Sequence, residues 1–110
     1  MGCTLRIYRN EDVKRVIAFI PPGHRHVRLL IELKDQTILL QEASVAAIVR
    51  AYIDVVTHPN RKAIELTISR LPSSERKPGY AEYQLIESGR SEEDVIAEVL
   101  RMLECSSESR

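Results

Sequence analysis

Several segments of the chain alternate between hydrophobic and polar residues. This period of two is typical of strands that bury one face. The pattern is clearest at 27–33, and it recurs at 4–9, 37–41, 62–71 and 80–87. Short connections between neighbouring segments favour antiparallel pairing. We therefore expect these five segments to be strands of a mainly antiparallel sheet.

Residues 11–20 fit two different patterns. Their apolar residues fall at positions i, i+3, i+4 and i+7, which is typical of a helix, and Asn10 is a suitable N-cap. However, the segment is rich in β-branched residues, and Pro21, Pro22 and Gly23 follow it directly as a turn signal. We favour a strand here, and a helix is the alternative.

Two further segments have the helical period. The first begins near Glu42 and ends before Pro59. It has two faces, a broad apolar one, which we call the large face, and one with several alanines, which we call the small face. The large face carries Val45, Ile48, Val49, Tyr52, Val55 and Val56, and the small face carries Ala43, Ala47, Arg50 and Asp54. The second segment, 91–103, begins with Ser91 and Asp94 in an arrangement that resembles a capping box.

The order of these elements is β-β-β-β-α-β-β-α, or β-α-β-β-α-β-β-α if residues 11–20 are helical. Either order predicts an α+β fold. We expect a single, mainly antiparallel sheet of five to six strands, with two helices packed on one face. Residues 1–104 would form one domain, and residues 105–110 would form a frayed C-terminal tail.

The charges balance overall, because 16 Lys and Arg residues face 16 Asp and Glu residues in 110 positions. The distribution is uneven, however. Residues 1–34 carry seven cationic residues against three acidic ones, and residues 87–110 carry three against seven. The zero net charge gives no general attraction to nucleic acid or to an anionic membrane. The opposed ends instead favour contact between a basic and an acidic region, within one chain or between two.

The sequence contains two cysteines, Cys3 and Cys105, which are too few for a disulfide framework. It has no apolar run of the roughly 20 residues that a membrane span requires, and its N-terminus has no signal-peptide core. We therefore expect a cytoplasmic protein that does not enter a membrane.

The most unusual motif lies at residues 21–28, where His24, Arg25, His26 and Arg28 follow the double proline. In a strand, His24 and His26 project to the same side, and two imidazoles so placed can bind zinc. A third and fourth ligand have no candidate nearby, so we expect no metal and no cofactor. The four residues remain candidates for contact with an anion or a partner.

Two other regions are candidate contact sites. The connection between segments 62–71 and 80–87 is longer than a hairpin needs, and it carries Arg76 and Lys77, which would contact an anionic partner. The small helix face of Ala43, Ala47, Arg50 and Asp54 is flat enough to serve as a subunit interface. No catalytic motif is present, so we assign no catalytic residue.

From these observations we expect a non-enzymatic protein that acts through protein contacts as a homodimer, with the basic N-terminal half of one chain against the acidic helix of the other. One alternative is a nucleic-acid-associated module that uses the basic residues of the N-terminal half. A second is a small enzyme in which His24, His26 or His58 acts as acid or base.

Overall fold

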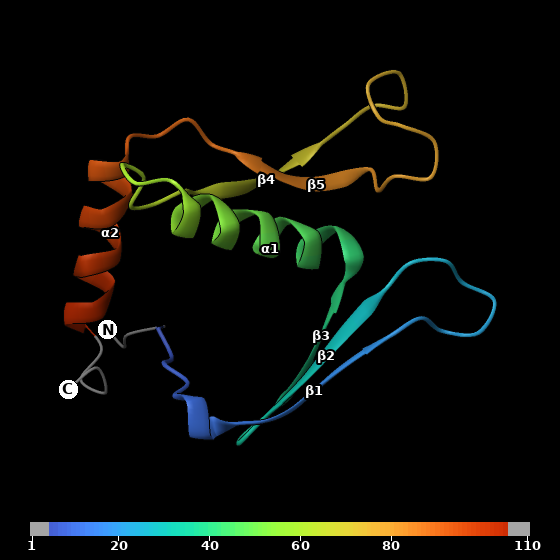
Figure 1. Cartoon of the computed structure of the whole chain (residues 1–110), viewed down its shortest axis with the longest axis horizontal. Helices are drawn as coiled ribbons and strands as arrows, with labels where there is room; N and C mark the ends of the chain where they lie inside the picture. The colour runs from blue at the N-terminus through green and yellow to red at the C-terminus, as the bar shows by residue number, and fades with distance from the viewer. Residues whose placement is uncertain (1–4, 106–110) are drawn as a thin grey trace.

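The computed structural model describes residues 5–105, and it has an α+β fold with two antiparallel sheets and two long helices (Figure 1). The first sheet contains β1 (Val13–Phe19), β2 (Arg28–Leu33) and β3 (Thr37–Gln41) in the order β1-β2-β3. The second contains β4 (Leu66–Arg70) and β5 (Tyr83–Glu87). A single turn of 3-10 helix, η1 (Asn10–Asp12), precedes β1.

The ambiguous segment 11–20 is a strand over most of its length, as we expected. Its β1 strand pairs with β2 in the register Val16↔Ile31. The strand ends at the double proline, where the His24 amide donates to the Pro21 carbonyl at 3.0 Å and Gly23 has a φ of 80°. A positive φ suits glycine because it has no Cβ atom to clash with the backbone. The β-branched residues and this turn therefore outweigh the helical spacing.

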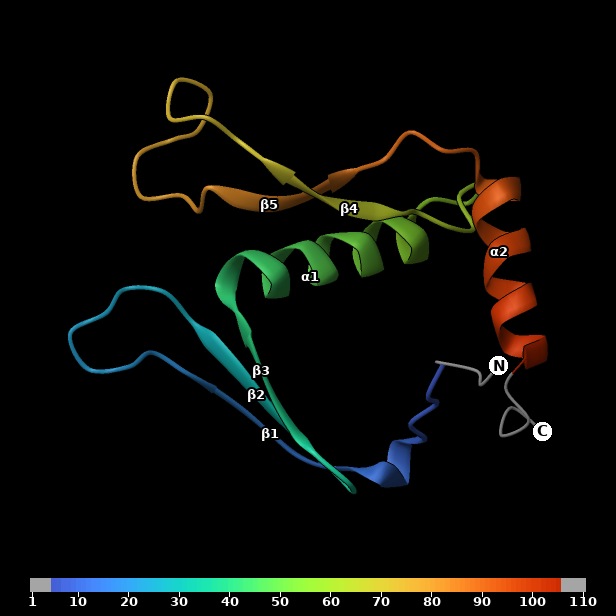
Figure 2. The ribbon, with the colours of Figure 1, turned by 180° about the vertical axis from the view of Figure 1, so that it is seen from behind.

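The expected single sheet is wrong, because the strands divide into a sheet of three and a sheet of two. Helix α1 (Glu42–Thr57) separates them, since it contacts β2 and β3 on one side and β5 on the other. Strands β3 and β5 therefore have a helix between them and cannot pair. Figures 1 and 2 show this arrangement from opposite sides.

The expected strand at 4–9 is also absent within the described part of that segment, 5–9. The alternation of apolar and polar residues nevertheless agrees with the burial of the side chains. Leu5 and Ile7 are half-buried, and Arg6 is exposed. The segment is attached through side chains instead. The Tyr8 hydroxyl donates to Asp35 at 2.8 Å, and Arg6 forms an ion pair with the same carboxylate at 2.9 Å.

The two helices do not lie on one face of one sheet, as we had expected. Helix α2 (Glu92–Cys105) lies beyond the C-terminal end of α1, across the end of the molecule (Figure 1). It begins as its sequence predicts, because the Asp94 amide donates to the Ser91 hydroxyl at 3.2 Å. It extends to Cys105, one residue past the expected domain boundary, and residues 106–110 lie outside the described residues. Cys105 is disulfide-bonded, and Cys3 also lies outside the described residues.

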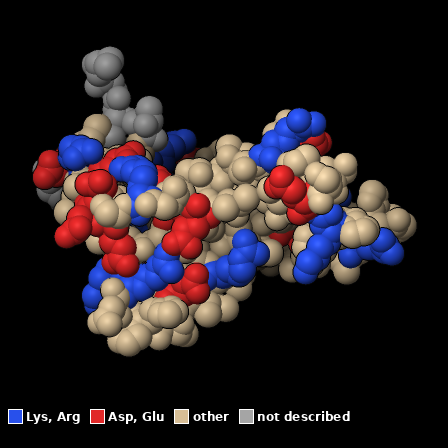
Figure 3. All heavy atoms as spheres, turned by 90° about the horizontal axis from the view of Figure 1, so that it is seen from above, with Lys and Arg blue, Asp and Glu red and all other residues tan. Residues whose placement is uncertain are grey.

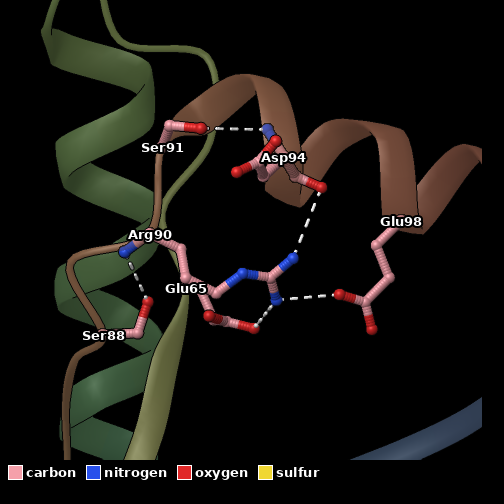
Figure 4. A network of polar contacts seen from close by, with 6 residues as sticks. All are labelled: Glu65, Ser88, Arg90, Ser91, Asp94 and Glu98. Atoms are coloured by element: carbon pink, nitrogen blue, oxygen red, sulfur yellow. Dashed lines mark hydrogen bonds and ion pairs between the residues drawn. The ribbon is translucent and has the colours of Figure 1, made fainter.

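Arg90 connects α2 to the second sheet (Figure 4). Its guanidinium donates to Glu65, next to β4, at 3.0 Å and to Glu98 of α2 at 2.8 Å. The hydrogen bond to Glu98 and the charge of Glu65 raise the pKa of Arg90 above its ordinary value. Arg90 therefore stays charged at any pH at which the protein is handled.

The chain buries little of its apolar surface. Among the described residues, the buried hydrophobic side chains are Leu33 of β2 and Ala47 of α1. The radius of gyration is 16.4 Å, whereas a compact domain of this length has about 13 Å. The fold therefore places much of its apolar surface at the outside.

Candidate binding cleft

An open cleft of about 590 Å³ lies where the N-terminal end of α1 meets both sheets. The first turns of α1 form its floor, the start of β2 and the end of β3 form one wall, and β4, β5 and the residues before β5 form the other. Its volume is within the range of small-molecule and peptide-side-chain sites.

The first wall and the floor supply cations. Arg28 of β2, Arg50 of α1 and the imidazole of His26 all line the cleft. Arg28 donates to the His26 carbonyl at 3.1 Å, which holds the guanidinium beside the chain that leads into β2. Arg50 is exposed, and within residues 5–105 it forms neither a hydrogen bond nor an ion pair. Its guanidinium is therefore available to an anion.

Glu42, in the first turn of α1, supplies a carboxylate to the cleft, and this carboxylate contacts two neighbouring groups of the chain. It accepts a hydrogen bond from the Val27 amide at 2.6 Å, and its second oxygen lies 3.3 Å from Nδ1 of His26. The hydrogen bond from Val27, followed by that from His26, lowers the pKa of Glu42 below its ordinary value of 4.5. Glu42 thus ties the start of β2 to α1, and its charge also attracts the guanidinium of Arg28.

The second wall is apolar and aromatic. Ile68 of β4 and Leu85 of β5 line it together with Tyr80 and Tyr83. Ile68 is 70% exposed, so the wall is open to a ligand rather than covered by the chain. The Lys77 ammonium lies 5.9 Å from the centre of the Tyr80 ring, which is within the range of a cation–π contact. A cationic wall therefore faces an apolar one.

The two loops that the sequence singled out lie at the same end of the molecule. The β1–β2 loop carries His24 and Arg25, the β4–β5 loop carries Arg76 and Lys77, and Figures 1 and 2 both place the loops on the side of the α1 N-terminus. His24 and Arg25 are exposed and do not line the cleft. Arg76 is half-buried, and it donates to the Leu71 carbonyl at 2.9 Å, which braces its own loop.

The residues that we had considered for a subunit interface are divided by the structure. Ala47 has no exposed surface, because it packs inside the single chain, and Ala43 and Asp54 are half-buried. Arg50 and Asp54 form no ion pair, although they lie one helical turn apart. Ala47 is therefore covered by this chain itself, while Ala43 and Arg50 line the cleft.

The opposite side of α1 is the exposed one. Five uncharged residues form a continuous surface there, which we call the α1 stripe: Ile48, Val49, Tyr52, Ile53 and Val56. Tyr52 is 68% exposed and Val56 is 61% exposed. The sequence indicated that this face is apolar, but it predicted burial within the chain. The two tyrosines of the cleft were missed, because only the folded chain brings them near Arg28 and Arg50.

No group of three or more His, Cys, Asp or Glu side chains in residues 5–105 is arranged to hold a metal ion. In the same residues, neither helix combines the length and the apolar character that crossing a bilayer requires.

Comparison of the chain with protein-family models, with curated proteins and with solved structures gives no match. The function must therefore be argued from the surfaces described above.

Proposed function

We propose that the protein is a non-enzymatic domain that acts through protein contacts and works as a homodimer joined by the α1 stripe. The observation that carries this proposal is the exposure of the stripe. Its residues form two rows with a spacing of four, 48-52-56 and 49-53. Rows of this kind form the ridges and grooves by which helices pack against each other.

The solvent-accessible surface area of the chain is large enough to include an interface with a partner. The chain exposes 8702 Å², whereas a compact monomer of 12.6 kDa exposes about 6,200 Å². The excess of roughly 2,500 Å² is larger than the area of about 800 Å² that each partner buries in an interface of standard size. The exposed apolar side chains of the α1 stripe are part of this excess, and a second chain would cover them.

The stripe suits a second copy of the same chain. It contains no charged residue, so two stripes can meet without burying an unpaired charge. A two-fold axis brings identical surfaces together, which is the commonest symmetry of homo-oligomers. An antiparallel pair of α1 helices would satisfy both conditions.

Ionic attraction between the chain ends has less support than the apolar contact. Arg15 pairs with Glu32 at 2.8 Å and Lys34 pairs with Asp12 at 3.7 Å, both inside the basic half. Arg90 pairs with Glu98 inside the acidic half. These pairs satisfy charge locally, so we expect the dimer to depend on apolar contact.

Sedimentation of the full chain at micromolar concentration tests the proposal. We expect a dimer whose dissociation constant changes little between about 50 mM and about 500 mM salt, because apolar contact is not screened. Tyr52→Glu should raise the dissociation constant about a hundredfold or more, since it buries a charge in the interface.

Ile20→Glu is the matched control, because it places the same charge on an exposed apolar position outside the stripe. It should leave the dimer intact. A strictly monomeric wild-type protein would refute the proposal, and equal weakening by both substitutions would refute the assignment of the interface to α1.

A further inference from the structure

The end of the molecule that carries the cleft holds five cations outside any ion pair of the described residues, although the charge of Glu42 attracts Arg28. They are Arg25, Arg28, Arg50, Arg76 and Lys77, and in residues 5–105 none of them forms an ion pair. Figure 3 shows blue side chains at the right-hand end, where the two loops lie, with red side chains among them. The cations outside ion pairs give this end a positive character although the whole chain has no net charge.

Three features of the cleft restrict what it can bind. Arg28 and Arg50 offer donors to a carboxylate, and guanidinium groups match carboxylate geometry well. Tyr83 and Ile68 on the facing wall offer apolar contact. Strand β5, which lines the cleft, pairs only with β4, so its other edge has no strand partner among the described residues.

We propose that this cleft binds an extended acidic peptide segment of a partner protein. The carboxylates of the peptide pair with Arg28 and Arg50, alternate apolar side chains pack on the tyrosine wall, and the peptide backbone pairs with the free edge of β5. Addition of a strand to an open sheet edge is a recurrent mode of peptide recognition.

The open shape favours a peptide over a small anion. A small anion would be enclosed by its donors, whereas here Arg50 and Ile68, which line the cleft, are exposed to solvent. The apolar wall would also contribute nothing to a simple inorganic anion. An extended chain uses both walls and the strand edge together.

This inference rests on the proposal that the protein acts through protein contacts, but it does not use the dimer interface. None of the α1 residues that line the cleft belongs to the α1 stripe. The two surfaces can therefore fail independently.

The test uses the full chain and a fluorescent peptide about eight residues long in which Glu and Val alternate, which spans about 27 Å when extended. Binding is followed by fluorescence anisotropy. We expect saturable binding that weakens as salt is added, because the contact is ionic at a solvated site. The same peptide with Gln in place of Glu should bind at least about tenfold more weakly.

Arg50→Gln should raise the dissociation constant of the Glu peptide about tenfold. This variant is a suitable choice, because the side chain of Arg50 has no hydrogen bond or ion pair to lose within the described residues. Arg101→Gln is the control, since Arg101 is an exposed arginine on α2, away from the cleft, and its loss should change nothing. Sedimentation of Arg50→Gln should give the same oligomeric state as the wild type.

Equal affinity for the Glu and Gln peptides would overturn the inference, and so would an unchanged affinity after Arg50→Gln. Displacement of the peptide by inorganic phosphate at the concentration of the peptide's own dissociation constant would also overturn it, because the site would then be a simple anion site. A monomeric protein that still binds the Glu peptide would refute only the dimer.

Discussion

The two helices are attached to the molecule in opposite ways. Helix α1 is fixed by the packing of small side chains, with Ala47 fully buried between elements of both sheets. Helix α2 is fixed at its N-terminal end by polar contacts, in which Arg90 binds Glu98 and the Lys62 amide donates to Glu92 at 2.9 Å. The position of α1 should therefore depend on side-chain size, and that of the N-terminal part of α2 on charge, while Cys105 holds its C-terminal end through a disulfide.

The largest change in stability should follow from placing a larger side chain where α1 packs against the sheets. Ala47→Leu inserts a branched side chain where no free surface exists, so we expect the free energy of unfolding to fall by about 1–3 kcal/mol. Urea denaturation at one fixed protein concentration measures the change, since the stability of a dimer depends on concentration.

Ala97→Leu provides the control for this substitution, because Ala97 is an exposed alanine in the middle of α2. A change within about 0.5 kcal/mol is expected there. If both variants lost the same stability, α1 would not depend on side-chain packing more than α2 does.

A smaller effect should follow from removing the charge that holds α2. Arg90→Gln loses the contacts to Glu65 and Glu98, whose carboxylates are partly exposed, so the loss of stability should be smaller than that caused by Ala47→Leu. Hydrogen exchange should localise this loss, with faster exchange in α2 and unchanged exchange in α1.

High salt should reduce the difference between Arg90→Gln and the wild type, because partly exposed pairs are screened. Arg101→Gln should leave the exchange of both helices unchanged. Faster exchange in α1 after Arg90→Gln would show that the two helices are not attached independently.

The elements of this fold were predictable because their signals are local. The stop at Pro59 and the cap at Ser91 each depend on a few neighbouring residues, and the structure has both, together with a tight turn at residues 34–36. The strands β2 and β3 follow from the same turn, since the Leu33 amide donates to the Gln36 carbonyl at 2.8 Å and the pairing register continues from there.

The division into two sheets was not predictable, because it depends on where α1 packs. A helical projection ranks faces by hydrophobicity, and it therefore assigned Tyr52 and Val56 to the core. Space between two sheets is limited, however, and the small side chain of Ala47 permits the closest approach. Only part of the cleft could be predicted from the sequence. Arg28 and Arg50 were candidates for separate reasons, and no sequence motif pointed to Tyr80 and Tyr83.

The smallest effect concerns the N-terminal end of α1, where packing is joined by an ionic contact. Glu42 accepts the Val27 amide hydrogen bond, and this contact lowers the pKa of Glu42 in the folded protein. A lowered pKa means that the ionised carboxylate stabilises the fold. That contribution is complete above the ordinary value of 4.5, and it is lost as the pH falls through the lower pKa of the folded state.

The chemical shift of the Val27 amide, followed by NMR during acidification, reports this contact directly. We expect it to move with a midpoint below 4.5 and to show no such transition in Glu42→Gln, which keeps an acceptor but cannot ionise. The shifts of the Ala47 methyl group should stay constant over the same range, because packing without charge does not titrate. A midpoint at or above 4.5 would mean that Glu42 gains nothing from Val27, and α1 would then be held by packing alone.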